Sequence, residues 1–458
     1  MLQVREMILR KLDASSLVNC RLVCHSWNLT ASSVLQKMPV WIKRDWSSDR
    51  WLRLYECMGK SQNFPCTALN LSLTSLSRCG RINNQNADKL FTAFGGHFTH
   101  LRLNNSYEEY PEMVINLLKK TPNLRFLEVS KLPEYVEDEG SEEFSMPSLR
   151  VLSVREGEGD GRSLTKLILS APQLVEIQNV NSSSAIQMEA IRVTGKMSLV
   201  SSLTLSADPE VPISSELTSN PPRLTALSVE SKDSSRQFVT AVKVVLAESQ
   251  RTLKKLEFLS FAVQLDEAPV LPNLQELGFK ISQKELKRGS PRAAVLPELS
   301  NNLFPKLKKI RLEVTGLDAT DYEIQQSDIE NLFWKECEEP MESLEMLELE
   351  IYCSPDTIKY LATIFPRVTF VSVNYSKFRY GSSSYRPTSH IWCLEEFPRL
   401  SKLFIRNLPY KNGFLDTALT GMPTEIIDKL EIAPKKTIPS DWNKILRPNG
   451  SILQLKSN

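Results

Sequence analysis

Thr121-Pro-Asn-Leu-Arg-Phe-Leu-Glu-Val129 is one copy of a phrase that the chain repeats, with variations, through most of its length. The phrase has a proline or polar residue, a large apolar residue, two variable residues, an apolar residue, one variable residue and another apolar residue. It returns as Met146-Pro-Ser-Leu-Arg-Val-Leu-Ser-Val154, Leu271-Pro-Asn-Leu-Gln-Glu-Leu-Gly-Phe279 and Phe397-Pro-Arg-Leu-Ser-Lys-Leu-Phe-Ile405. Such a repeat predicts a solenoid, which more often offers a binding surface than a catalytic pocket.

The spacing of the phrases indicates one repeat array. The first large apolar residue of each phrase recurs at intervals of 26, 25, 25, 26, 24, 29, 21, 33, 37, 24 and 32 residues. The first intervals are nearly regular, whereas the later ones carry insertions. The marker residues are Phe98, Leu124, Leu149, Leu174, Val200, Leu224, Leu253, Leu274, Leu307, Leu344, Val368 and Leu400.

Each phrase predicts a short strand, because its apolar-variable-apolar core has the period of two that is typical of a strand with one buried face. Several phrases follow a helical pattern, as at Met113–Lys120, and the proline then ends the helix. We therefore expect an α/β solenoid with parallel short strands inside and helices outside. Strands of a doubly wound α/β domain are the alternative, but such folds do not place one proline-led phrase before each strand.

This pattern resembles the leucine-rich repeats of the intracellular type, which form a horseshoe. The Asn or Cys that usually follows the strand is missing, and Leu132, Gly157 and Leu408 hold three of its places. We therefore expect a divergent, locally irregular array over residues 65–458. A linker or capping segment over residues 46–64 would precede it.

The first 45 residues lack the repeat and predict a small helical module. Met7, Ile8 and Leu12 form an apolar stripe, and Asp13 or Ser15 can cap a second helix. We expect that helix to carry one broad face that consists of Leu17, Cys20, Val23, Cys24 and Trp27.

The stretch Ile8-Leu-Arg-Lys-Leu-Asp-Ala-Ser-Ser-Leu-Val-Asn-Cys-Arg-Leu-Val-Cys-His-Ser-Trp27 resembles the F-box, the three-helix module that docks to the Skp-type adaptor of cullin–RING ubiquitin ligases. The family motif opens with Leu-Pro, whose places fall at or before Met1, followed by an acidic residue, whose place is held by Gln3. We therefore expect an N-terminally incomplete module. A helical cap on the open end of the array is the alternative. The resemblance implies roles in adaptor binding, or in holding the helices together, for Leu9, Leu12, Leu17, Val23, Cys24 and Trp27.

Strand residues that alternate with the buried ones would face a partner on the inner side of the array. Neighbouring strands lie about 4.8 Å apart, so these side chains form a continuous ladder. Aromatic anchors commonly dominate interfaces, although any single position on such a face can also be merely solvated. The candidate substrate-binding residues are Phe126, Glu128, Arg311, Glu348, Phe370 and Phe404.

Composition and motifs argue against several other functions. The chain has 56 basic and 54 acidic residues, which gives no reason to expect nucleic acid or a membrane surface as the main partner. It lacks a signal peptide's unbroken apolar segment and any stretch near the roughly 20 residues of a membrane span. Phosphate loops, nucleophile elbows and metal-ligand spacings are also missing. We therefore expect a cytoplasmic or nuclear protein with no catalytic residue, metal or cofactor.

The resemblance implies a non-catalytic substrate receptor. The F-box would bind the Skp-type adaptor, the adaptor would bind a cullin, and the repeats would hold an unknown protein substrate near a charged ubiquitin-conjugating enzyme. Catalysis would then come from proximity, because holding two reactants together raises their effective concentration. The alternative from another class is a leucine-rich-repeat scaffold with no role in ubiquitin transfer.

Overall fold

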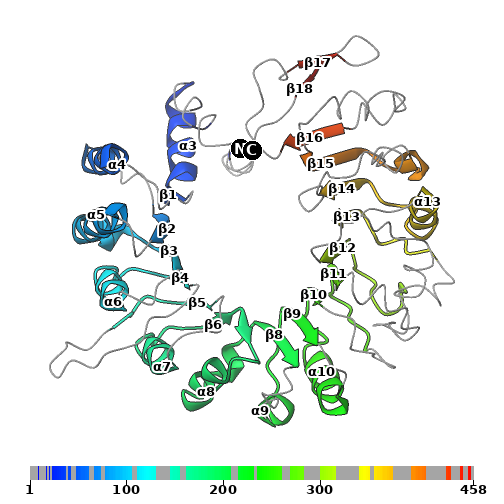
Figure 1. Ribbon diagram of the computed structural model, residues 1–458, viewed down its shortest axis with the longest axis horizontal. Helices are drawn as coiled ribbons and strands as arrows, with labels where there is room; N and C mark the ends of the chain where they lie inside the picture. The colour runs from blue at the N-terminus through cyan, green and yellow to red at the C-terminus, as the bar shows by residue number, and fades with distance from the viewer. Residues whose placement is uncertain are drawn as a thin grey trace. The chain divides into compact units, whose positions relative to one another are not determined.

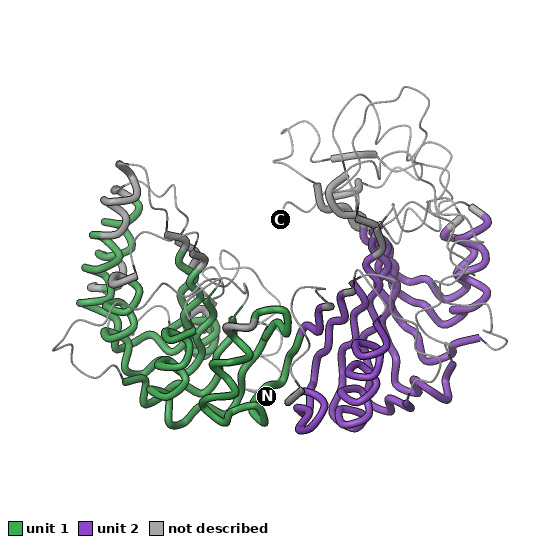
Figure 2. Tube along the Cα trace, turned by 60° about the horizontal axis from the view of Figure 1, so that its bottom comes forward, with its two compact units in different colours: residues 1–203 green, residues 204–458 purple. Residues whose placement is uncertain are grey.

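The computed structural model divides the chain into two compact units, unit 1 over Met1–Leu203 and unit 2 over Thr204–Asn458 (Figure 2). No helix in the described part of the chain is long and apolar enough to span a membrane. The structure describes residues 9, 17, 20, 23–37, 40–42, 48–60, 67–73, 78–105, 111–129, 145–154, 161–207, 215–231, 235–259, 269–282, 300–315, 340–350, 355–374, 393–408, 430–434, 444–446 and 452–454.

Unit 1 contains a parallel sheet whose strand order, β1 to β6, follows the chain. Helices α5, α6 and α7 lie along one side of these strands (Figure 1). The strands are β1 (Val40–Ile42), β2 (Ala68–Leu73), β3 (His100–Asn105), β4 (Phe126–Val129), β5 (Val151–Val154) and β6 (Glu176–Gln178), and β7 (Val180–Asn181) follows them. The helices are α3 (His25–Lys37), α4 (Ser48–Lys60), α5 (Arg78–Phe94), η1 (Gly95–His97), α6 (Pro111–Lys119), α7 (Gly161–Leu169), α8 (Ala185–Val193) and η2 (Met197–Leu199).

Unit 2 continues the same plan. Its strands β9 to β16 are parallel and again lie in chain order. The strands are β8 (Ser202–Ala207), β9 (Ala226–Ser231), β10 (Lys255–Phe258), β11 (Glu276–Ser282), β12 (Lys309–Thr315), β13 (Met346–Glu350), β14 (Phe370–Asn374), β15 (Lys402–Leu408), β16 (Leu430–Pro434) and the antiparallel pair β17 (Lys444–Leu446) and β18 (Ile452–Gln454). The helices are α9 (Ser215–Ser219), α10 (Arg236–Glu248), α13 (Pro355–Ile364) and η4 (Cys393–Glu396).

The repeated phrase forms a tight turn. The amide of Leu124 donates to the carbonyl of Thr121 at 3.1 Å, and the turns Phe304–Leu307 and Phe397–Leu400 close in the same way at 3.1 Å each. Proline holds the second position of these turns, where its fixed φ is favourable. The residue that opens each turn and the residue that closes it are both buried, so the phrase reverses the chain between two core positions.

Backbone hydrogen bonds join each repeat to the next. The carbonyl of Thr99 accepts the amides of Arg125 and Phe126 at 2.8 and 3.0 Å, and the carbonyl of Arg125 accepts those of Arg150 and Val151 at 2.9 and 3.0 Å. The same arrangement recurs in unit 2. It aligns successive strands, so equivalent residues of neighbouring repeats stand side by side; where β15 pairs with β16, the register shifts between Arg406 and Leu408.

Alternate strand residues form the core of each unit. Leu101, Leu127 and Leu152 are register partners on β3, β4 and β5, and all three are fully buried. In unit 2 the rings of Phe258 and Phe279 stack with centroids 5.6 Å apart. The predicted fold class, short parallel strands with helices on one side, is confirmed.

Candidate binding surfaces

The N-terminal module has a small apolar core. Its buried members are Leu9, Leu17, Ala31 and Val34, and Cys20 and Trp27 are packed against them and partly buried. The motif positions Leu9 and Leu17 therefore hold the helices together, with no side-chain surface left for a partner. Leu12 lies outside the described residues.

The expectation that one helix carries Val23 and Cys24 on a face with Leu17 is wrong. Val23 lies in a turn, where its amide donates to the carbonyl of Cys20 at 3.3 Å, and α3 begins only at His25. The turn redirects the chain, so the Val23 side chain is 65% exposed and Cys24 is exposed too. Leu29 on α3 is likewise exposed. The module therefore combines a buried apolar core with separate apolar side chains on its surface.

On the inner strand face of unit 1, the candidates Phe126 and Glu128 lie on β4. Glu128 is a register partner of Arg102 on β3, and Arg102 Nε lies 3.1 Å from Glu128 Oε2. The Glu128 side chain is only 6% exposed, whereas that of Arg102 is 43% exposed. A partner at this point would therefore meet the cation first, with the carboxylate beneath it.

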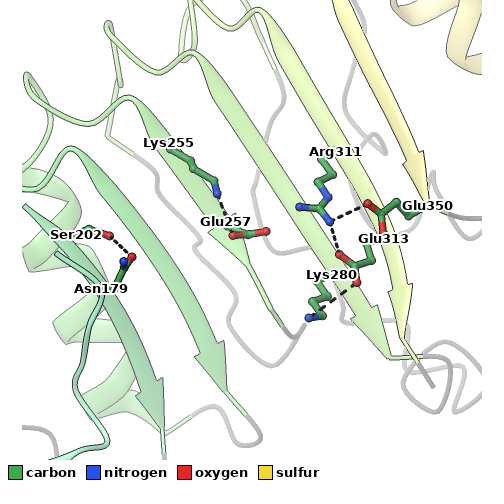
Figure 3. A network of polar contacts seen from close by, with 8 residues as sticks. All are labelled: Asn179, Ser202, Lys255, Glu257, Lys280, Arg311, Glu313 and Glu350. Carbon is green, nitrogen blue, oxygen red and sulfur yellow. Dashed lines mark hydrogen bonds and ion pairs between the residues drawn. The ribbon is translucent and has the colours of Figure 1, made fainter. Parts of the chain in front are cut away.

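In unit 2, Arg311 on β12 is the centre of an ion-pair network (Figure 3). Its terminal Nη2 donates to Glu313 Oε2 at 2.9 Å and to Glu350 Oε1 at 2.8 Å. Lys280 Nζ approaches Glu313 from the other side at 3.9 Å. The Nε of Arg311 is buried and has no hydrogen-bond partner among the described residues.

A third carboxylate acts on Arg311 from two strands away. Glu257 on β10, Gly278 on β11 and Arg311 on β12 occupy one register row, and Lys255 Nζ lies 3.4 Å from Glu257 (Figure 3). Burial lowers the pKa of Arg311, but Glu350, Glu313 and Glu257 outweigh it, so the pKa is raised above its ordinary value. The guanidinium therefore remains a fixed cation on this face.

The remaining candidates continue the face along β13, β14 and β15. Glu348 is the register partner of Arg311 and pairs with Lys309 at 3.1 Å. Lys402 Nζ lies 5.8 Å from the ring centroid of Phe370, and Phe404 is half-buried. The structure thus places Arg311, Glu348, Phe370 and Phe404 on neighbouring strands of one sheet, while Phe126 and Glu128 belong to unit 1.

The sequence interpretation missed several charged members of this face. It took one residue between the two buried positions of each repeat, but the residue two places further along points to the same side of a strand. That rule would have added Lys280, Glu313 and Glu350, which the structure places in the network. Among the described residues, no His, Cys, Asp and Glu side chains form a group of three that could hold a metal ion.

Comparison with known proteins identifies the N-terminal module. Residues 3–37 match the F-box domain, and a search among curated proteins finds no match to the chain. A chain of the crystal structure of the Rad7 and Elc1 complex in yeast is similar at 15% identity over 88% of each chain, with a TM-score of 0.40. A chain of the TLR13–ssRNA13 complex is similar at 16% identity over 83% of this chain and 47% of that one, with a TM-score of 0.29. The chain thus carries an F-box domain over residues 3–37, and parallel strands in chain order with helices along one side follow it.

Proposed function

We propose that this chain is the substrate-recognition subunit of a cullin–RING ubiquitin ligase. The observation that carries the proposal is the F-box match over residues 3–37, ahead of a repeat array. The module would bind a Skp-type adaptor and, through it, a cullin, in the cytoplasm or the nucleus. The repeats would hold a protein substrate. The subunit itself would make no bond and would act by bringing the substrate close to a charged conjugating enzyme.

The division between core and surface in the module supports a distinct adaptor-binding role for Val23. Leu9 and Leu17 are buried, whereas Val23, Cys24 and Leu29 are exposed. Apolar side chains that a small module leaves in solvent are natural contacts for a partner protein, where their burial adds to affinity. We therefore assign adaptor contact to the exposed set and a packing role to the buried set.

The inner strand face supports the substrate-binding half of the proposal. Its ion pairs join strands that are neighbours in the sheet, so the charged groups are held in place before a partner arrives. Such preorganisation reduces the entropy that binding must overcome. The half-buried Phe370 and Phe404 add apolar area beside this network.

Co-expression with a Skp-type adaptor tests the adaptor-binding half. We would compare the wild type with Val23→Asp and with the matched control Val175→Asp, since these valines are 65% and 63% exposed and both lie outside helices. The expected result is a complex that co-purifies with the wild type and with Val175→Asp, and that Val23→Asp abolishes. Circular dichroism would show that each variant is folded.

Two results would contradict this proposal. Failure of the folded wild type to bind any Skp-type adaptor would remove the ubiquitin role and leave a repeat scaffold. Equal loss of binding in both valine variants would show that the complex does not depend on the F-box surface.

A further inference from the structure

Four side chains on β3 and β4 of unit 1 form a compact cluster on the inner strand face. His100 and Arg102 are two residues apart on β3 and so point to the same side of the sheet. Their register partners on β4 are Phe126 and Glu128. Arg102 Cζ lies 5.8 Å from the centroid of the Phe126 ring, and the His100 ring stacks on that ring with centroids 5.9 Å apart and planes 26° apart.

This arrangement fixes the Arg102 guanidinium in a defined orientation. Its Nε is paired with the buried Glu128, and the ring of Phe126 supports the cation by a cation–π contact. Within the described residues, Glu128 is the only acidic partner of Arg102. The exposed part of the guanidinium therefore presents hydrogen-bond donors to solvent in a fixed planar geometry, which suits a carboxylate.

Counted over the described residues of this cluster and the neighbouring Arg125, the net charge is about plus one. Arg102 and Arg125 each carry a positive charge, and Glu128 compensates only one of them. Burial lowers the pKa of His100, and the charges of Arg125 and Arg102 lower it further, so the imidazole is uncharged at neutral pH. One negative charge is needed to balance the cluster, whereas a phosphate would bring nearly two.

We propose that His100, Arg102 and Phe126 form a subsite for one carboxylate, supplied by an Asp or Glu side chain in a segment of the protein substrate. The guanidinium binds the carboxylate, and Phe126 holds the guanidinium and offers apolar contact to the neighbouring part of the segment. This inference rests on the proposed function, because it names the chemistry that the repeats recognise in a substrate.

Selection from a random displayed peptide library against the full chain tests the subsite. The proteins compared are the wild type, Arg102→Gln and the matched control Arg192→Gln, which removes an exposed arginine on α8 that is paired with Glu189. We expect the wild type and Arg192→Gln to enrich Asp and Glu over the input library, and Arg102→Gln to lose this enrichment. Enrichment that persists in Arg102→Gln, or none in the wild type, would overturn the subsite.

A selected peptide would then be synthesised in its native form, with Gln in place of its acidic residue, and with phosphoserine there. We expect the native form to bind at least about tenfold more tightly than the Gln form, and the phosphoserine form to bind no better than the native one. Tighter binding of the phosphoserine form would replace the carboxylate assignment by a phosphate one.

Histidine NMR gives a second readout. The chain has four histidines, and His100→Gln identifies the His100 signal. Binding of the native peptide should shift that signal, while an unchanged signal would place the peptide elsewhere. If Arg102→Gln proves unfolded, Arg102→Lys keeps the charge without the planar donors and should weaken binding. Adaptor binding without acidic selection would overturn the subsite alone, whereas acidic selection without adaptor binding would support the subsite and overturn the ligase role.

Discussion

Glu257 crosses directly over Gly278: a Cβ atom at position 278 would lie 3.1 Å from Glu257 Cγ. Gly278 sits between β10 and β12, so the absence of its side chain lets Glu257 approach Arg311 across the intervening strand. The glycine is thus part of the charge network on the inner face of unit 2, although it contributes no charge to it.

Gly278→Ala should have opposite effects in two backgrounds. With Glu257 present, we expect a loss of up to about 1 kcal/mol, because the new methyl group displaces a carboxylate that Lys255 also holds. With Glu257→Ala, the same change should stabilise the protein by about 0.5 kcal/mol, since glycine loses more conformational freedom than alanine in a strand. Urea denaturation of the wild type, the two single variants and the double variant gives the coupling free energy between positions 257 and 278. If Gly278→Ala changed the free energy of unfolding equally in both backgrounds, the close approach of Glu257 to Gly278 would be contradicted.

Asn179 between β6 and β7 has a φ of 59°, in the left-handed region. Its Nδ2 also donates to Ser153 Oγ at 2.8 Å. Alanine tolerates the left-handed backbone conformation less well than asparagine and cannot make the hydrogen bond. Asn179→Ala should therefore lower the free energy of unfolding by about 2 kcal/mol. Asn179→Gly loses only the hydrogen bond, so it should cost about half as much. Thermal denaturation ranks the two variants, and an alanine variant as stable as the glycine one would refute the backbone argument.

Leu17 and Val23 should separate folding from adaptor binding. Leu17→Ala removes a fully buried side chain from the module's core and should cost about 2–4 kcal/mol. Val23→Ala removes an exposed side chain and should change stability by less than about 0.5 kcal/mol. Hydrogen exchange over residues 25–37 reports on the module. Val23→Ala should weaken adaptor binding without speeding amide hydrogen exchange in these residues. Faster exchange in Val23→Ala would show that Val23 packs within the module instead.

His100 predicts a loss of stability on acidification. Burial, followed by Arg125 and Arg102, lowers its pKa from 6.5 in the folded chain. The unfolded chain therefore takes up a proton first, and stability falls as the pH drops through 6.5 and levels off below the lowered pKa. The Tm of His100→Gln should fall less over this range than that of the wild type. A constant difference in Tm between the two proteins would show that His100 does not titrate as the structure implies.

The repeat phrase predicted the fold because it reports on two local requirements at once. Buried positions such as Leu124 need apolar residues, and the second position of the turn from Thr121 favours a proline. The sequence interpretation took that proline as a helix terminator, whereas the structure places it inside a hydrogen-bonded turn. Both interpretations lead to a strand at the same place, so the fold was predictable although the stated reason was incomplete.

The candidate site was less predictable, because exposure and pairing depend on neighbours in space. The alternation that marked Glu128 as outward-facing is local, but Arg102 of the preceding repeat covers it. Likewise, nothing local distinguishes Val23 from Leu17, since only the turn after Cys20 moves Val23 away from the core. The assignment of Glu128 needed the register between repeats, and that of Val23 needed the position of the turn.

In each of several repeats, one backbone carbonyl, such as that of Thr99, accepts two amides from the following repeat. These hydrogen bonds also determine how the array would unfold under force. Each of these links joins immediate neighbours along the chain, so tension on the two ends of a unit would release one repeat at a time instead of rupturing the whole sheet. In the regular part of the array a repeat of 25 residues would lengthen by about 85 Å as it extends. A force–extension trace of this regular part would therefore be a series of evenly spaced steps.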